Sequence, residues 1–140
     1  MRNRTSLVLM EQLIMVLVFA LAAALCLQVF VRADRISRET GRRDLAVSLA
    51  QNAAETLKAC RGDLEEAARI LQGSKEQEGC MVYYDQTANP VKEGAQWQYR
   101  LEIAGMDADK AGLGQARVQV FFHGEEEALF SLTVAWQEVE

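Results

Sequence analysis

The sequence has few of the residues that carry out catalysis or hold metal ions. It contains one histidine, His123, so no second histidine is available for acid-base chemistry. It has no nucleophile motif and no glycine-rich loop of the kind that cradles phosphate. The histidine and the three cysteines do not show the close ligand spacing of a zinc site. We therefore expect a protein that is not an enzyme and that has no metal site and no cofactor.

Positive charge is also limited. The 140 residues contain 20 acidic and 15 basic side chains, and several arginines gather directly after the apolar N-terminal stretch. Binding to nucleic-acid phosphates needs a basic face. We therefore expect no direct contact with nucleic acid.

An apolar run at the N-terminus is the most prominent feature of the sequence. From Leu7 to Val31 its only charged residue is Glu11. A helix of about 25 residues crosses a hydrocarbon core of roughly 30 Å, so we expect residues 7–31 to span a lipid bilayer. A carboxylate inside such a span is costly unless it is paired or reaches the interface. Glu11 is therefore either a functional residue with a partner or an interfacial residue favoured by the positive helix N-terminus.

Two ordinary targeting signals fit this stretch less well. A cleaved secretory signal would use the small residues at 22–24, but its apolar region is normally uncharged and about 7 to 15 residues long. A lipoprotein signal would end at Cys26, but the residue before a lipidated cysteine is normally small and here it is Leu25. Cys26 is better explained as a small hydrophobic residue of the membrane helix.

The segment TSLVLME, residues 5–11, resembles the prepilin processing site of type IV pilins and type II secretion pseudopilins. The resemblance implies that prepilin peptidase removes a leader of residues 1–6 on the cytoplasmic side, cutting between Ser6 and Leu7, and that Leu7 is then N-methylated. Glu11 would occupy the fifth mature position, where the family has a glutamate. The sequence departs from the family in having Ser6 for the usual glycine and Val8 for the common threonine.

The resemblance also implies a function and a set of partners. The chain is expected to be a structural subunit of a type IV pilus, a type II secretion system or a competence-type filament. Its partners would be prepilin peptidase, other pilin or pseudopilin subunits through the N-terminal helix, and the membrane platform of the assembly machine. Pro90 is the only proline, so the helix-kinking proline of many major pilins is missing, which favours a minor pilin or pseudopilin.

Electrostatics gives Glu11 a role that agrees with the resemblance. Cleavage would create a positive amine at Leu7, and in a staggered bundle the amine of one subunit can meet the Glu11 carboxylate of a neighbour. Burying such a pair costs far less than burying either charge alone. The alternative function is an uncleaved single-pass membrane protein whose small domain is a binding or regulatory module.

The arginines on either side of the span disagree with the expected orientation. Arg2 and Arg4 precede it and five arginines follow within residues 32–43, a count that alone would place the C-terminal side in the cytoplasm. Prepilin processing requires the leader to be cytoplasmic, and acidic residues interleave with the five arginines as helix-surface pairs. We therefore expect a single-pass inner-membrane protein with a cytoplasmic N-terminus and an extracytoplasmic C-terminal domain.

Beyond the membrane, the periodicity predicts that the helix continues over residues 32–60. Apolar side chains recur every four residues there and form an amphipathic stripe that faces a small domain. They are Leu45, Leu49, Ala53 and Leu57. A glycine costs about 1 kcal/mol relative to alanine in a helix interior, so we expect a bend or a frayed turn near Gly41.

Residues 61–140 are expected to form a small C-terminal domain. Asp63 followed by Glu66 is a capping-box pattern that starts a short helix, which Gly73 ends. After this helix the apolar period changes to two, which predicts β-strands. The expected strands are 97–103, 116–122 and 130–136, with a further one at 81–84. The predicted fold class is α+β, with the second half of the long helix packed on a small antiparallel sheet of about three to four strands.

Two features of this domain have more than one interpretation. Cys60 and Cys80 can form a disulfide worth roughly 3 kcal/mol or remain unpaired thiols, because spacing does not fix geometry. The run Glu125–Glu127, which follows His123 and Gly124, is expected to be a solvated hairpin turn. A site for a basic partner or a hard cation is the alternative for this run.

Overall fold

The computed structural model describes residues 2–108 and 112–138 of the chain. It divides into two compact units, one ending at Gly41 and the other beginning at Arg42. Residue 1 of the expected leader, and residues 109–111 and 139–140 of the expected C-terminal domain, lie outside the described residues.

A single helix, α1 (Arg2–Ala59), makes up the described part of the first unit and continues into the second. No frayed turn occurs at Gly41, so that part of the prediction is wrong. The residues before this glycine support the helix, since Arg38 Nε lies 3.1 Å from Asp34 Oδ2 one turn earlier. A penalty of about 1 kcal/mol is too small to interrupt a helix that is supported on both sides.

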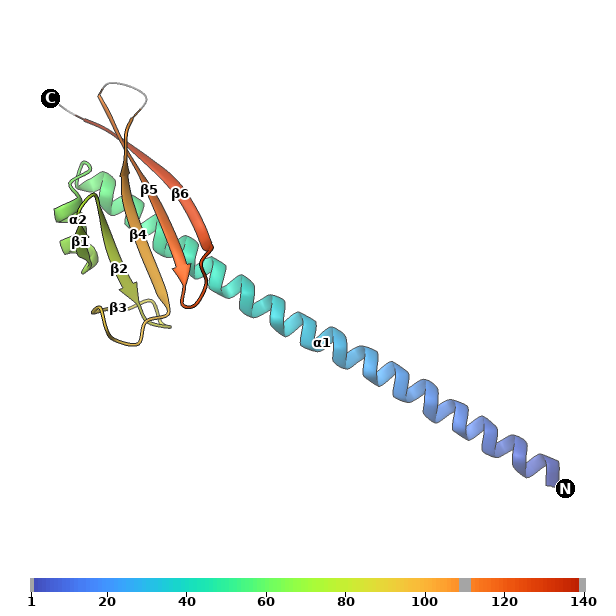
Figure 1. The fold of residues 1–140 in the computed structure, drawn as a ribbon. Coiled ribbons are helices and arrows are strands. Elements are labelled where there is room, and N and C mark those ends of the chain that lie inside the picture. The colour runs from blue at the N-terminus through green and yellow to red at the C-terminus, as the bar shows by residue number, and fades with distance from the viewer. Residues whose placement is uncertain (1, 109–111, 139–140) are drawn as a thin grey trace. The chain divides into compact units, whose positions relative to one another are not determined.

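The second unit is an α+β domain, as the sequence predicted (Figure 1). Five strands lie side by side in the order β1-β2-β4-β5-β6, β3 pairs with β2, and every pairing is antiparallel. The strands are β1 (Ser74–Glu76), β2 (Gly79–Tyr84), β3 (Pro90–Val91), β4 (Tyr99–Met106), β5 (Leu113–Phe122) and β6 (Ala128–Gln137).

The sheet has more strands than the three or four that the sequence predicted. The additional strands are β1, with three residues, and β3, with two, and both pair with β2. Segments this short do not show an apolar period of two, so the pattern did not reveal them.

The hydrophobic core lies between the last part of α1 and one face of the sheet (Figure 1). The predicted stripe is confirmed, because Leu49, Ala53 and Leu57 are buried together with Ala46 and Ala50, and Leu45 is half-buried against them. Alternate residues of three strands cover the stripe from the sheet side. They are Cys80, Val82 and Tyr84 of β2, Tyr99, Leu101 and Ile103 of β4, and Ala116, Val118 and Val120 of β5.

One aromatic residue does not lie where strand alternation predicts it. Trp97 was expected to share the core face with Tyr99, but β4 begins only at Tyr99. The Trp97 ring packs instead against Tyr83 and His123, with ring centroids 5.3 and 4.4 Å apart. Tyr83 alternates with the buried residues of β2, so this cluster lies on the outer face of the sheet.

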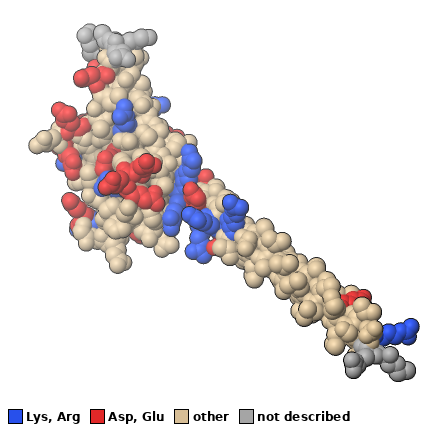
Figure 2. All heavy atoms as spheres, turned by 45° about the vertical axis from the view of Figure 1, so that its right-hand side comes forward, with Lys and Arg blue, Asp and Glu red and all other residues tan. Residues whose placement is uncertain are grey.

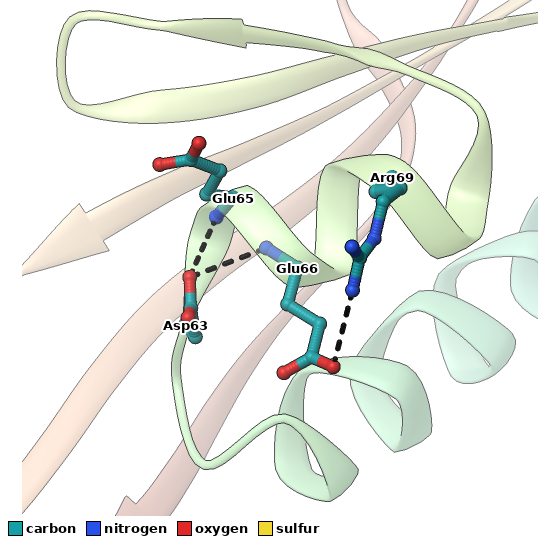
Figure 3. A network of polar contacts seen from close by, with 4 residues as sticks. All are labelled: Asp63, Glu65, Glu66 and Arg69. Carbon is teal, nitrogen blue, oxygen red and sulfur yellow. Dashed lines mark hydrogen bonds and ion pairs between the residues drawn. The ribbon is translucent and has the colours of Figure 1, made fainter.

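The short helix α2 (Leu64–Leu71) begins where the sequence predicted it. Asp63 is its N-cap, and Asp63 Oδ1 accepts hydrogen bonds from the backbone N–H groups of Glu65 (2.9 Å) and Glu66 (3.2 Å) (Figure 3). The Glu66 side chain does not complete the capping box, because it pairs with Arg69 instead, with Nη2 and Oε1 3.5 Å apart.

The end of α2 differs by one residue from the expected Gly73. Gln72 takes the left-handed conformation at φ 59°, and the N–H of Gly73 donates to the Ala68 carbonyl at 2.8 Å. The inner face is as predicted, with Ala67, Ala68 and Leu71 buried.

Trp136 ties the edge strand β6 to β5 and to the turn after α1. Its indole lies against the backbone of Gly114, its cross-strand partner, and of Gly62. A Cβ atom at either glycine would overlap the indole. Gly62 also has φ 83°, a conformation that side-chain-bearing residues rarely adopt.

Gly114→Ala is expected to destabilise the domain by about 1–3 kcal/mol, because the added methyl group overpacks the contact with Trp136. Denaturant unfolding of the full chain in detergent micelles, followed by tryptophan fluorescence, measures this loss. Gly105→Ala is the matched control in a strand, since the nearest atom to a Cβ there is the Glu78 carbonyl oxygen at 3.5 Å. Equal unfolding midpoints for the two variants would contradict the proposed packing.

Candidate functional site on the exposed apolar helix

The first unit exposes an apolar surface from Leu7 to Val31. Large apolar side chains between Leu7 and Val31 are 52% to 77% exposed. The most apolar window of this helix has a mean hydropathy of 2.8, and none of it is buried within the chain. By length and composition, α1 can cross a membrane, and lipid is the environment that suits such a surface. The segment is almost free of charged side chains in Figure 2.

Glu11 is the one carboxylate on this surface. It is exposed, and in the described part of the chain no basic side chain forms an ion pair with it. Leu7 lies one turn earlier on the same side of α1, about 6 Å along the helix axis. An amine at Leu7 would therefore lie on the same face as the Glu11 carboxylate.

The bond between Ser6 and Leu7 lies within α1, which begins at Arg2. Proteases preferentially cut segments that are exposed and weakly held. The first N–H groups of a helix lack intrahelical acceptors, so a helix end opens more easily than its middle. Cleavage after Ser6 therefore requires only the first turns of α1 to unwind.

The second unit contains a hollow whose charged lining is largely acidic. Among the residues that the structure describes, no three His, Cys, Asp or Glu side chains are placed to hold a metal ion. The hollow, of about 590 Å³, lies beside the β1-β2 hairpin, and its charged lining includes Glu76, Glu78 and Glu102.

Sequence reasoning missed an aromatic cluster on the outer face of the sheet. The Arg100 guanidinium lies 4.8 Å from the Phe121 ring centroid and 6.0 Å from that of Trp97. A cavity of about 520 Å³ lies beside Trp97 and His123. The sequence did contain a sign of this cluster in the adjacent residues Phe121 and Phe122. Neighbours in a strand face opposite sides of the sheet, so one of these two rings must lie on the outer face.

The turn between β5 and β6 agrees with the prediction of a solvated hairpin. The N–H of Glu125 donates to the Phe122 carbonyl at 3.0 Å, and all three residues of the run Glu125–Glu127 are exposed. The ring of Phe122, the residue before His123, also contacts Arg42, whose guanidinium lies 4.3 Å from the ring centroid.

The structure contains Cys60 and Cys80 as free thiols. Cys80 is 3% exposed in the core, and burial raises the pKa of its thiol to about 11. Burial and the nearby carboxylates of Glu66 and Asp63 also raise the pKa of Cys60. Disulfide formation by thiol exchange needs a thiolate, which both environments disfavour. The third cysteine, Cys26, is exposed on α1.

Comparison with protein-family models, with curated proteins and with solved structures gives no match to this chain. Its function is therefore inferred from its own residues. Ser6, Leu7 and Glu11, which the sequence singled out, all lie on the exposed N-terminal part of α1.

Alkaline pH is expected to destabilise the domain through Cys80 and Tyr84. Burial raises their folded-state pKa values to about 11 and about 12, from 9.0 and 10.0. Their contribution to stability is thus fully present below pH 9.0 and is lost as the pH rises through the folded values. The free energy of unfolding should fall by up to about 1.4 kcal/mol per pH unit for each group.

Denaturant titrations of the full chain at a series of pH values measure this dependence. Cys80→Ala should show a shallower fall between the unfolded and folded pKa values of this thiol than the wild type. Cys26→Ala, which removes an exposed thiol, should behave like the wild type. Identical pH dependence in all three proteins would show that the Cys80 thiol is not buried as described.

Proposed function

We propose that this chain is a structural subunit of a pilin-like filament, a minor pilin or pseudopilin that prepilin peptidase cleaves between Ser6 and Leu7. The observation that carries the proposal is a lone carboxylate, Glu11, on an apolar helix surface, five positions beyond that bond. No described basic group of its own chain pairs with it. Cleavage would create the missing cation on each neighbouring subunit.

The pairing depends on cleavage, because Leu7 has no free amine in the uncut chain. An ion pair between the Leu7 amine of one subunit and Glu11 of the next would offset their helices by about four residues, or about 6 Å. In a low dielectric this pair costs far less than two isolated charges. Repeated with the same offset and rotation, a contact of this head-to-tail kind generates a helical filament.

The small domain would give each subunit a stable body outside the lipid. The last part of α1 forms one wall of its core, so the helix that makes the contact between subunits is held by the domain as well as by lipid. In this proposal the N-terminus is cytoplasmic and the domain extracytoplasmic. The partners are the peptidase, sister subunits, the assembly platform and the bilayer.

A second candidate is an uncleaved single-pass protein whose domain binds a partner. Two observations favour it. The bond after Ser6 is helical, and the arginines beyond the span would, by their usual distribution, keep the C-terminal side in the cytoplasm. The cavity beside Trp97 on the outer sheet face would then be the first place to look for a ligand.

Intact-mass spectrometry of the full chain extracted from membranes that contain prepilin peptidase separates the two candidates. The filament proposal expects a chain that begins at Leu7 and carries one added methyl group. An intact Met1, or a lipid on Cys26, would contradict it. Ser6→Gly is the matched control, because it restores the usual residue before the cut and should be processed at least as fast as the wild type.

Glu11→Ala is expected to leave the protein in the membrane but to lower its incorporation into filaments by roughly tenfold or more, since the neighbour's amine loses its counter-charge. The measurement is the fraction of the protein recovered in sheared or cross-linked assemblies relative to the membrane fraction. Gln12→Ala, which removes the adjacent uncharged polar side chain, should have little effect. Unchanged incorporation of the Glu11 variant would count against the ion pair.

A further inference from the structure

The distance between Glu11 and Arg32 matches the thickness of a bilayer core. Residues 12–31 separate the two charges, and α1 is unbroken through them. These residues, about 20 in number, rise about 30 Å along a helix, which is the thickness of the hydrocarbon region. They contain no charged side chain, so this stretch fits the hydrocarbon without burying a charge.

Arg32 and Arg35 occupy the first turn beyond this stretch and lie on the same side of the helix. Both are exposed, and among the described residues no acidic side chain forms an ion pair with either. Arg38, one turn further, is paired with Asp34. At this end of the apolar run, the two nearest guanidinium groups therefore have no carboxylate partner among the described residues. Figure 2 shows basic side chains gathered along the helix directly beyond the apolar segment.

We propose that Arg32 and Arg35 bind the phosphate groups of anionic lipids in the leaflet at the C-terminal end of the span. This contact fixes the depth of α1, so that Glu11 lies at the opposite boundary of the hydrocarbon. Guanidinium groups form paired, charge-assisted hydrogen bonds with phosphate. Each headgroup layer is about 5–7 Å thick, which matches the axial length of residues 32–35.

The competing arrangement immerses the whole apolar run from Leu7. That run measures about 37 Å, about 7 Å more than the hydrocarbon, so the helix would have to tilt and Glu11 would enter the lipid interior. With the arginines at the headgroups, Leu7 and Glu11 both remain close to the opposite interface. The inference rests on α1 crossing a membrane, and it does not depend on cleavage or filament assembly.

Lipid selectivity tests the arginine contact directly. Native mass spectrometry of the full chain, released from micelles with equal amounts of phosphatidylglycerol and phosphatidylcholine, should show preferential retention of the anionic lipid. The double variant Arg32→Gln, Arg35→Gln should lose this preference by roughly 30-fold. The double variant Lys92→Gln, Arg117→Gln removes two exposed charges of the domain and should keep it. Equal retention of both lipids by the wild type would overturn the proposal. It would indicate instead that the arginines bind an acidic protein partner.

Nitroxide labels test the depth of the helix in phosphatidylglycerol vesicles. Cys26 is a native labelling site, with Cys60 and Cys80 replaced by alanine and folding checked by circular dichroism. Its label should lie about 9 Å inside the boundary at Arg32. A second label is placed at Val8→Cys in a chain that also lacks Cys26. Its accessibility to water-soluble relaxants should be that of a nitroxide in the headgroup layer. A Val8 label inside the hydrocarbon would overturn the proposed depth.

These readouts are the same for a chain that begins at Met1 and for one that begins at Leu7. Failure of cleavage would therefore contradict the filament proposal alone. Failure of lipid selection or of the expected depth would contradict the arginine anchor alone.

Discussion

The domain depends on the close packing of small side chains of α1 against the sheet. Ala46, Ala50 and Ala53 are fully buried and belong to the core cluster that α1 shares with the sheet. Leu49 and Leu57 fill the remaining space beside the large side chains of β4 and β5. An antiparallel sheet with one apolar face needs a cover on that face, and the last part of α1 supplies it together with α2.

The same helix meets two different environments, and its composition changes accordingly. Between Leu13 and Val31 it is apolar on all sides and carries large residues such as Leu, Val and Phe, which suit lipid tails. From Leu45 to Leu57 it is apolar on one stripe only, and that stripe is rich in alanine. An all-round apolar surface has no preferred partner among protein faces, whereas a stripe fixes which side of the helix packs on the sheet.

The features that the sequence predicted correctly are those that repeat over many residues. The long helix, its buried stripe and the alternating strands β4, β5 and β6 each extend over eight residues or more, so several side chains support each assignment. The cap of α2 was predictable for another reason, because Asp63 acts through its own side chain on the next residues of the chain. For the candidate site, Ser6, Leu7 and Glu11 come from a sequence pattern, and the structure adds that all three lie on an exposed helix.

The features that were missed depend on contacts between distant parts of the chain. β1 and β3 exist because β2 offers them a partner, and nothing in their own few residues requires a strand. Trp97 lies just before β4, so the alternation of side chains along the strand does not determine its direction. Its position is determined instead by packing against the rings of Tyr83 and His123. The sequence left the state of Cys60 and Cys80 open, because it depends on where the turn after α1 lies relative to the core face of β2.

The contact of Trp136 with two glycines has a practical consequence. The domain contains two tryptophans in different surroundings, Trp136 against the backbone of Gly62 and Gly114, and Trp97 beside aromatic and cationic side chains. The emission of the first depends on the contact between the turn after α1 and the edge of the sheet, and that of the second on the outer face. The chain therefore carries one intrinsic optical probe on each face of its sheet, and replacing either tryptophan by phenylalanine would leave a signal from the other face alone.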